Sequence, residues 1–269
     1  MTYLDRIVDA HRRDAARDER SLEDLIGRAG EVAAPRGFRA ALAAAAAATT
    51  ADGSPVVAVV AEVKRRSPSK GPLAPDLDPA ALATTYEAGG AACLSVLTDR
   101  EFFGGSPEDL AVARDACSLP VLRKDFTVSA RDVAEARLMG ADAVLLIAAV
   151  LDPRELAELH SLAIRLRLDA LVEVHDEREL AIALDVGATL VGVNQRDLVT
   201  FEVDTDRAVR MAGRMPPEVV AVAESGIRGP SDARRLAEAG YHAVLVGESL
   251  VTAADPAAAV AALVRAAEA

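Results

Sequence analysis

Several ionisable side chains stand at the ends of short apolar segments, where a plain core would not need a charge. They are Glu62, Lys64, Lys124, Glu173 and Glu224. Because an unpaired charge is costly to remove from water, these groups would have to compensate one another if they met at one place. Such neighbours also shift each other's pKa values, which is how general acids and bases are made in proteins. The residue types therefore indicate proton-transfer chemistry.

A basic segment, AEVKRRSPSKG (61–71), places four cations within seven residues of a chain whose formal net charge is −12. The preceding residues 56–60 are almost all β-branched, so they are predicted to form a buried strand that leads into a loop. That loop could be an ordinary solvated turn or an anion site. Since consecutive side chains diverge, we expect Lys64 to point into a site and Arg65 to point away from it.

The composition favours aliphatic packing and a small anionic ligand. Of the 269 residues, 51% are hydrophobic but only 3% are aromatic. This balance suits parallel strands under helices better than an aromatic-rich β-sandwich. The isoelectric point near 4.9 argues against general nucleic-acid binding, because affinity for a phosphate backbone needs a broad basic face.

The sequence contains no signal for export, a membrane or a metal. Cys93 and Cys117 cannot form a disulfide framework, and neither has the spacing of a metal site. The N-terminal residues are charged, and no apolar run reaches membrane-spanning length. We therefore expect a cytoplasmic protein with no membrane partner and no metal.

Short apolar runs alternate with amphipathic ones after a charged N-terminal segment and an alanine-rich stretch. The predicted strands are residues 56–63, 92–97, 120–124, 142–148, 170–174, 189–194, 219–224 and 242–247. Segments of helical length, such as 152–167 and 229–240, lie between them. Several begin with Pro, Ser or Asp and end with Gly, which are helix start and stop signals.

Strands that alternate with helices pair in parallel. Eight strands with helical segments between them predict an α/β fold, which is a single (β/α)8 TIM barrel over residues 51–269. Residues 1–50 are predicted to form an N-terminal helical extension that packs on the barrel. An open doubly wound sheet is the alternative, although its fingerprint GxGxxG is absent after the first strand. In a barrel, the active site is expected at the carboxyl ends of the strands.

Other polar and glycine-bearing positions also follow the predicted strands. Asn194 and Arg196 could bind a ligand, or could simply cap a turn and pair with a nearby carboxylate. His175 lies just past the fifth strand, where a turn or helix-start role is favoured over a catalytic one. The segments ESGIRGPSD and VGESL follow the last two strands. In phosphate-binding barrels, those loops present backbone N–H groups to a phosphate.

Nine segments together closely resemble those of the indole-3-glycerol phosphate synthase family. They are AEVKRRSPSKG, LSVLTD, FFGGS, PVLRKDF, GADAVLLIAA, LVEVHD, VGVNQRDL, AESGI and LVGESL. The resemblance extends in register from about residue 55 to about residue 255, and AEVKRRSPSKG, PVLRKDF and VGVNQRDL are its most specific motifs. The first 50 residues match in length and helical character more than in motif.

The resemblance implies a carboxy-lyase of tryptophan biosynthesis that uses no cofactor. The reaction would be decarboxylative ring closure of 1-(2-carboxyphenylamino)-1-deoxyribulose 5-phosphate to indole-3-glycerol phosphate, carbon dioxide and water. Lys124 would be the general acid that protonates the ribulose carbonyl. Lys64 would bind the substrate carboxylate and serve as a second acid, with Glu62 and Glu173 as candidate bases. Asn194 would complete the catalytic set.

The pKa of Lys124 is expected to be lowered by Lys64 and by partial burial, against the opposing effect of Glu62 and Glu173. A lowered pKa would allow an ammonium to deliver a proton near neutral pH.

The resemblance also implies substrate-binding positions around these groups. They are Ser67, Phe103, Phe126, Leu145, Arg196, Leu198, Ser225, Gly226, Gly247 and Glu248. Phe103 and Phe126 would flank the aromatic ring, and the serine and glycine positions would surround the phosphate. Two residues depart from the family pattern, Gln195 and Glu248. An acidic Glu248 beside a phosphate can help only if its backbone N–H faces the ligand.

Alternative functions remain open from the residues themselves. A phosphoribosylanthranilate isomerase would require a Cys at the end of the first strand, where this chain has Glu62 and Lys64. A class I aldolase would use Lys64 or Lys124 to form a Schiff base. A non-catalytic phosphosugar-binding barrel would not need the lysines and glutamates together. We expect a monomer whose partner is a small phosphorylated molecule.

Overall fold

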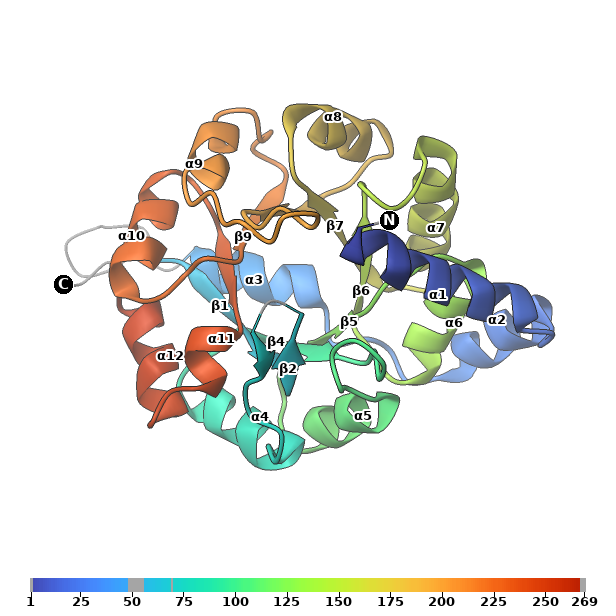
Figure 1. The fold of residues 1–269 in the computed structure, drawn as a ribbon, viewed down its shortest axis with the longest axis horizontal. Helices are drawn as coiled ribbons and strands as arrows, with labels where there is room; N and C mark the ends of the chain where they lie inside the picture. The colour runs from blue at the N-terminus through green and yellow to red at the C-terminus, as the bar shows by residue number, and fades with distance from the viewer. Residues whose placement is uncertain (1, 48–55, 69, 267–269) are drawn as a thin grey trace.

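The computed structural model describes residues 2–47, 56–68 and 70–266. Within these residues, eight parallel strands close into a barrel in the order β1-β10-β9-β8-β7-β6-β5-β4 (Figure 1). The bounds are Ala58–Val63 (β1), Cys93–Leu97 (β4), Val121–Lys124 (β5), Ala143–Ile147 (β6), Asp169–Val174 (β7), Leu190–Asn194 (β8), Val220–Glu224 (β9) and Ala243–Val246 (β10). The predicted (β/α)8 barrel is confirmed, and the open sheet is excluded.

Helices follow the strands and form the outer layer of the barrel (Figure 1). They are α4 (Pro79–Ala88), α5 (Pro107–Asp115), α6 (Ala130–Leu138), α7 (Pro153–Arg165), α8 (Glu177–Asp185), α9 (Arg207–Ala212), α10 (Pro230–Glu238), α11 (Glu248–Val251) and α12 (Pro256–Val264). Several of these helices begin at a residue whose side chain accepts a backbone N–H of the first turn. In α7, the Asp152 carboxylate accepts the Glu155 N–H at 2.8 Å and the Glu155 carboxylate accepts the Asp152 N–H at 3.0 Å. This reciprocal pair satisfies two N–H groups that the helix itself leaves free.

Alternation along each strand separates the outer core from the barrel interior. In β1, Val59 and Ala61 pack outward against the helices, whereas Ala58 and Val60 pack with the interior residues. The next inward position in β1 is Glu62. The same two-residue step leads from Leu122 to Lys124, from Leu171 to Glu173 and from Val222 to Glu224. The inward-facing residues are therefore apolar inside the barrel and charged at the carboxyl ends of these strands.

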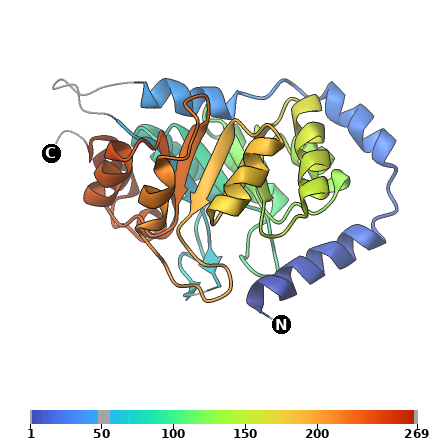
Figure 2. The same ribbon diagram turned by 90° about the horizontal axis from the view of Figure 1, so that it is seen from above.

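The N-terminal segment runs past the barrel from one end to the other (Figure 2). Helix α1 (Tyr3–Arg17) lies at the carboxyl ends of the strands, and α2 (Leu22–Glu31) packs against α6. Helix α3 (Phe38–Ala46) lies at the opposite end, where Phe38 and Leu42 are fully buried among the interior residues. Helix α3, which precedes the barrel in sequence, therefore closes the barrel core at the end opposite α1 (Figure 2).

A short hairpin extends the first strand over the same end as α1. It consists of β2 (Arg66–Ser67) and β3 (Gly71–Pro72), which pair in antiparallel fashion. The predicted boundary between residues 50 and 51 lies outside the described residues. Among the helices of the described ranges, none combines the length and the apolarity that crossing a bilayer would require.

Candidate active site

A cavity of about 310 Å³ opens at the carboxyl ends of the strands. All the catalytic and substrate-binding residues predicted from the sequence line it. They are Glu62, Lys64, Ser67, Phe103, Lys124, Phe126, Leu145, Glu173, Asn194, Arg196, Leu198, Ser225, Gly226, Gly247 and Glu248. Residues that are far apart in sequence meet here because parallel strands present their carboxyl ends at one edge of the barrel.

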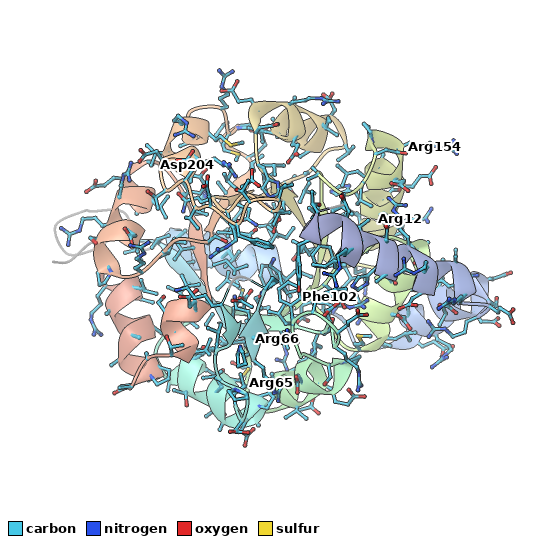
Figure 3. The ribbon with its side chains drawn as sticks, viewed as in Figure 1. Arg12, Arg65, Arg66, Phe102, Arg154 and Asp204 are labelled. Carbon is cyan, nitrogen blue, oxygen red and sulfur yellow. The ribbon has the colours of Figure 1, made fainter. Side chains whose placement is uncertain are left out.

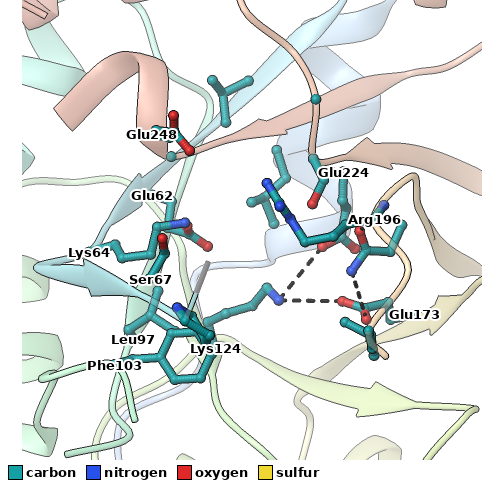
Figure 4. A pocket seen from close by; sticks show the side chains of 18 of the residues that line it. Glu62, Lys64, Ser67, Leu97, Phe103, Lys124, Glu173, Arg196, Glu224 and Glu248 are labelled. Carbon is teal, nitrogen blue, oxygen red and sulfur yellow. Dashed lines mark hydrogen bonds and ion pairs between the residues drawn. The ribbon is translucent and has the colours of Figure 1, made fainter. Parts of the chain in front are cut away.

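Lys124, the last residue of β5, lines the cavity and directs its ammonium toward Glu173 (Figure 4). Its Nζ lies 3.4 Å from Glu173 Oε2 and 3.8 Å from Glu224 Oε2. Burial by itself would lower the pKa of Lys124, but Glu173, Glu224 and Glu62 outweigh it and raise that pKa above the usual lysine value. The expected lowering was therefore wrong. The carboxylates are closer to the ammonium than the sequence revealed, and Lys64 is paired elsewhere.

The Glu173 carboxylate is held as an anion by several donors. Its Oε1 accepts a hydrogen bond from Asn194 Nδ2 at 3.1 Å, and its Oε2 faces Lys124. Burial alone would raise the pKa of Glu173, but Lys124, His175 and Asn194 together lower it. An ionised carboxylate in this position can accept a proton.

The pKa of Glu224 is shifted in the opposite direction. Its side chain is buried, and its Oε1 has no hydrogen-bond partner among the described residues. Burial and the neighbouring Glu173 raise the pKa of Glu224 to about 8. Space for this side chain depends on Gly192, since a Cβ there would lie 2.1 Å from Glu224 Oε1. Glu224 is predicted from the sequence at a strand end, but the sequence assigns it no specific role in catalysis or binding.

Lys64 and Glu62 form an ion pair on the other side of the cavity. Gly247 leaves room for this pair, because a Cβ at that position would lie 2.3 Å from Glu62 Oε1 and 3.0 Å from Lys64 Nζ. Arg65 turns away from the cavity and pairs with Asp109 of α5 (Figure 3). Lys64 and Arg65 thus point in opposite directions, as their adjacency predicts.

The two glycine-bearing turns line a neighbouring part of the cavity. Ser225 and Gly226 have φ angles of 66° and 75°, in the left-handed region. A Cβ on Gly226 would lie 2.5 Å from Val203 Cγ1, so the turn needs glycine for its conformation and for space. Gln195 Nε2 donates to the Ser225 carbonyl at 2.7 Å, which gives this departure from the family pattern a supporting role.

Lys70 at the hairpin contacts the Glu248 side chain by an ion pair. Both residues line the cavity. The Glu248 carboxylate is therefore directed at a cation of the hairpin. Lys70 belongs to the basic segment that could form an anion site, but it is not one of the site residues predicted from the sequence.

An aromatic wall completes the cavity. The Phe103 and Phe126 ring centroids are 6.2 Å apart with an interplanar angle of 35°. Asp99 shapes the loop that carries Phe103, since its Oδ1 accepts the N–H groups of Phe102 at 2.6 Å and Phe103 at 3.0 Å. Asp99 was not predicted as a site residue. Its short-range turn contacts depend on a backbone path that the sequence pattern does not reveal.

Asn194 and Arg196 are held by the loop after β8. The Asn194 Oδ1 accepts the Arg196 N–H at 3.0 Å, and Arg196 Nη1 donates to the Phe201 carbonyl at 3.1 Å. Arg207 Nη1 donates to the Asn194 carbonyl at 2.9 Å. The Asn194 side chain therefore links Glu173 to the backbone of the loop that carries Arg196.

Within the described residues, His11, Asp99 and Asp125 form the cluster that could be considered for a metal. His11 Nε2 lies 2.9 Å from Asp99 Oδ2, while Asp125 Oδ2 is already contacted by Thr98 at 2.5 Å and by Arg123 at 3.0 Å. The Arg123 guanidinium already pairs with the Asp125 carboxylate and would repel a metal ion bound there. The donor set fits a structural link between α1 and the barrel better than a metal centre.

Comparison with known proteins decides the family. A model of the family described as indole-3-glycerol phosphate synthase matches residues 4–263. The chain belongs to the indole-3-glycerol phosphate synthase family. A relative from Streptomyces coelicolor, named indole-3-glycerol phosphate synthase 2, is 51% identical over 247 residues, which is 91% of this chain and 90% of the relative. A relative from Leptothrix cholodnii, named indole-3-glycerol phosphate synthase, is 50% identical over 249 residues, 93% of either chain.

Membership in the indole-3-glycerol phosphate synthase family confirms the resemblance seen in the sequence and the prediction of a carboxy-lyase of tryptophan biosynthesis. Solved structures support the fold alone. A thiamine phosphate pyrophosphorylase from Pyrococcus furiosus has a TM-score of 0.58 at 16% identity and covers 79% of this chain and 96% of its own. A structure titled "Native KDPGal structure" has a TM-score of 0.54 at 16% identity, over 77% of this chain and 93% of that one.

Proposed function

We propose that the cavity residues named above carry out the decarboxylative ring closure of 1-(2-carboxyphenylamino)-1-deoxyribulose 5-phosphate. One observation carries the assignment: the Lys124 ammonium, which lines the cavity, lies within 3.8 Å of both the Glu173 and the Glu224 carboxylates. This arrangement supplies a charged acid and an ionised carboxylate within one buried site. It also disfavours a Schiff-base role, because a lysine held as an ammonium is not a nucleophile.

Ring closure is the first step. The ring carbon that bears the carboxylate attacks the ribulose carbonyl carbon, and the carbonyl oxygen receives a proton from Lys124 Nζ. A raised pKa keeps that proton on Lys124 across neutral pH. Transfer becomes favourable only as the oxygen gains alkoxide character, which makes it a stronger base than an amine. The acid therefore acts in the transition state and not before it.

Loss of carbon dioxide and water follows. The Lys64 ammonium pairs with the substrate carboxylate, which leaves as carbon dioxide while the electron pair of the broken bond returns to the ring. Lys64 then protonates the hydroxyl that departs as water, and Glu62 or Glu173 accepts the proton released as the indole forms. The Lys64–Glu62 ion pair and the ionised state of Glu173 support these roles.

Binding groups surround the reacting centre. The backbone N–H groups of the turns at Ser225–Gly226 and Gly247–Glu248 bind the phosphate, with Ser67 across from them. Asn194 and Arg196 hold the ribulose chain. The anthranilate ring lies against Phe103 and Phe126, with Leu145 and Leu198 as its apolar neighbours.

Fluorescence detection of indole-3-glycerol phosphate from the carboxyphenylamino substrate tests this function directly. The wild-type chain is expected to form product without added metal or cofactor, and borohydride is expected to trap no adduct. Absence of product, or a trapped lysine adduct, would contradict the proposal. We also propose that the protein is a monomer and is cytoplasmic. Light scattering of the purified chain tests the monomeric state.

A further inference from the structure

His175 takes no part in the reaction proposed above, yet its ring lies directly behind a reacting group. It follows β7 by one residue, two positions after Glu173, so both side chains leave the strand on the same face. His175 Nε2 lies 3.6 Å from Glu173 Oε1. The His175 side chain is only 12% exposed. The contact is therefore shielded from water.

Glu179 of α8 fixes the orientation of this ring. Its Oε2 accepts the His175 backbone N–H at 2.7 Å and lies 3.1 Å from His175 Nδ1. Asp176 caps α8 by accepting the Glu179 N–H at 2.8 Å, which holds the start of the helix in place. Since an ionised carboxylate can only accept hydrogen bonds, Nδ1 carries a hydrogen and Nε2 is the atom left to face Glu173.

The protonation state of Nε2 follows from its surroundings. This nitrogen is buried and has no hydrogen-bond partner among the described residues. A neutral ring would aim a lone pair at the Glu173 carboxylate, whereas a protonated ring would aim an N–H at it. Burial alone would lower the pKa of His175, but Glu179 and Glu173 raise it, and Arg207 of α9 opposes them only in part. The two flanking carboxylates therefore favour the protonated ring more than water does.

We propose that His175 is a positioning residue for Glu173, and that its protonated ring, aimed by Glu179, keeps the Glu173 carboxylate ionised and turned toward the cavity. Asn194 Nδ2 donates to Oε1 and His175 Nε2 faces the same oxygen at 3.6 Å, which leaves Oε2 for Lys124 and the substrate. The inference rests on the proposed function in so far as that function gives Glu173 a role as base.

A titration tests the contact without any turnover. The chain has four histidines, so imidazole resonances can be assigned with His175→Gln and followed by NMR against pH. His175 is expected to titrate above the ordinary value of about 6.5. Glu173→Gln and Glu179→Gln should each lower its midpoint by about one pH unit or more, because each removes an adjacent negative charge. The other histidines serve as internal controls.

Kinetics then tests the consequence. His175→Gln retains an amide N–H that can reach Glu173 but has no charge, so the pKa of Glu173 should rise. The acidic limb of kcat should move up by about one pH unit with KM little changed. His175→Leu, which cannot donate, should lower kcat further, and partial recovery in His175→Gln would distinguish positioning from packing.

Two outcomes would overturn the proposal: a His175 midpoint that does not move in either glutamate variant, or an acidic limb that does not move in His175→Gln. A wild-type chain that forms no indole product would instead contradict the proposed function. In that case the NMR titration still decides whether His175 and Glu173 form a charged pair.

Discussion

At the scale of single residues, Lys124 is the group whose removal is most informative. Lys124→Met should lower kcat by about 10²- to 10⁴-fold, the range that positioned proton transfer contributes. KM should change little, because the contacts proposed for the substrate phosphate and carboxylate involve other residues of the cavity. Steady-state kinetics with fluorescence detection measures both terms. A variant with a raised KM and an unchanged kcat would make Lys124 a binding residue.

Lys64→Met is the matched comparison for Lys124. The proposed contact between Lys64 and the substrate carboxylate exists in the ground state as well as in the transition state. KM should therefore rise and kcat should fall. The Lys64–Glu62 ion pair is also lost in this variant, which leaves Glu62 buried without its cation. Identical kinetic defects in the two lysine variants would show that the different roles proposed for Lys64 and Lys124 are wrong.

The turn at Ser225–Gly226, proposed to bind the phosphate, provides a third prediction at this scale. Gly226→Ala places a Cβ 2.5 Å from Val203 Cγ1 on a residue whose φ is 75°. KM for the substrate should rise several-fold while the barrel stays folded. Gly187→Ala is the control, since Gly187 has a φ of 82° but no atom within 4 Å of the added Cβ. If both variants showed the same KM, the turn at Gly226 would not contact the phosphate.

At the scale of elements, α1 is tied to the loops that follow β4 and β5. His11 bonds to Asp99, and its ring lies 5.5 Å from that of Phe126. Burial alone would lower the pKa of His11, but Asp99 and Asp125 raise it. The stabilisation should therefore be complete below about pH 6.5, the unfolded value, and should fall as the pH rises through the higher folded value.

His11→Gln tests this link. The free energy of unfolding should drop by about 1–2 kcal/mol at pH 6, with a smaller difference from wild type at pH 9. Urea denaturation at the two pH values measures it. A difference that grew toward alkaline pH would mean that the neutral ring makes the stabilising contact.

At the scale of the whole molecule, α3 closes the barrel at the end opposite the cavity. Leu42 is fully buried among the interior residues, which include Val60 and Leu190. Leu42→Ala should lower the free energy of unfolding by about 2–5 kcal/mol, because the cavity it leaves is surrounded by rigid strands. Denaturant titration measures this loss, and KM of the folded fraction should be unchanged. A loss of no more than about 0.5 kcal/mol, the scale of surface substitutions, would place α3 outside the cooperative core.

The sequence by itself determined the strands and the barrel, because the evidence for them is local. Apolar runs such as residues 142–148 report a buried strand directly. Charged residues that end those runs, among them Glu62, Lys124 and Glu173, mark the site because the carboxyl ends of all strands meet at one edge.

Only the tertiary structure decided how those charges pair. Lys124 meets Glu173 across 49 positions of sequence and Glu224 across the barrel, which reverses the direction expected for the pKa of Lys124. The link between His11 and Asp99 spans 88 positions and is likewise absent from any local pattern. Electrostatic effects depend on distances of a few ångströms and on burial, and both are set by the closure of the whole barrel and not by the neighbours of a residue along the chain.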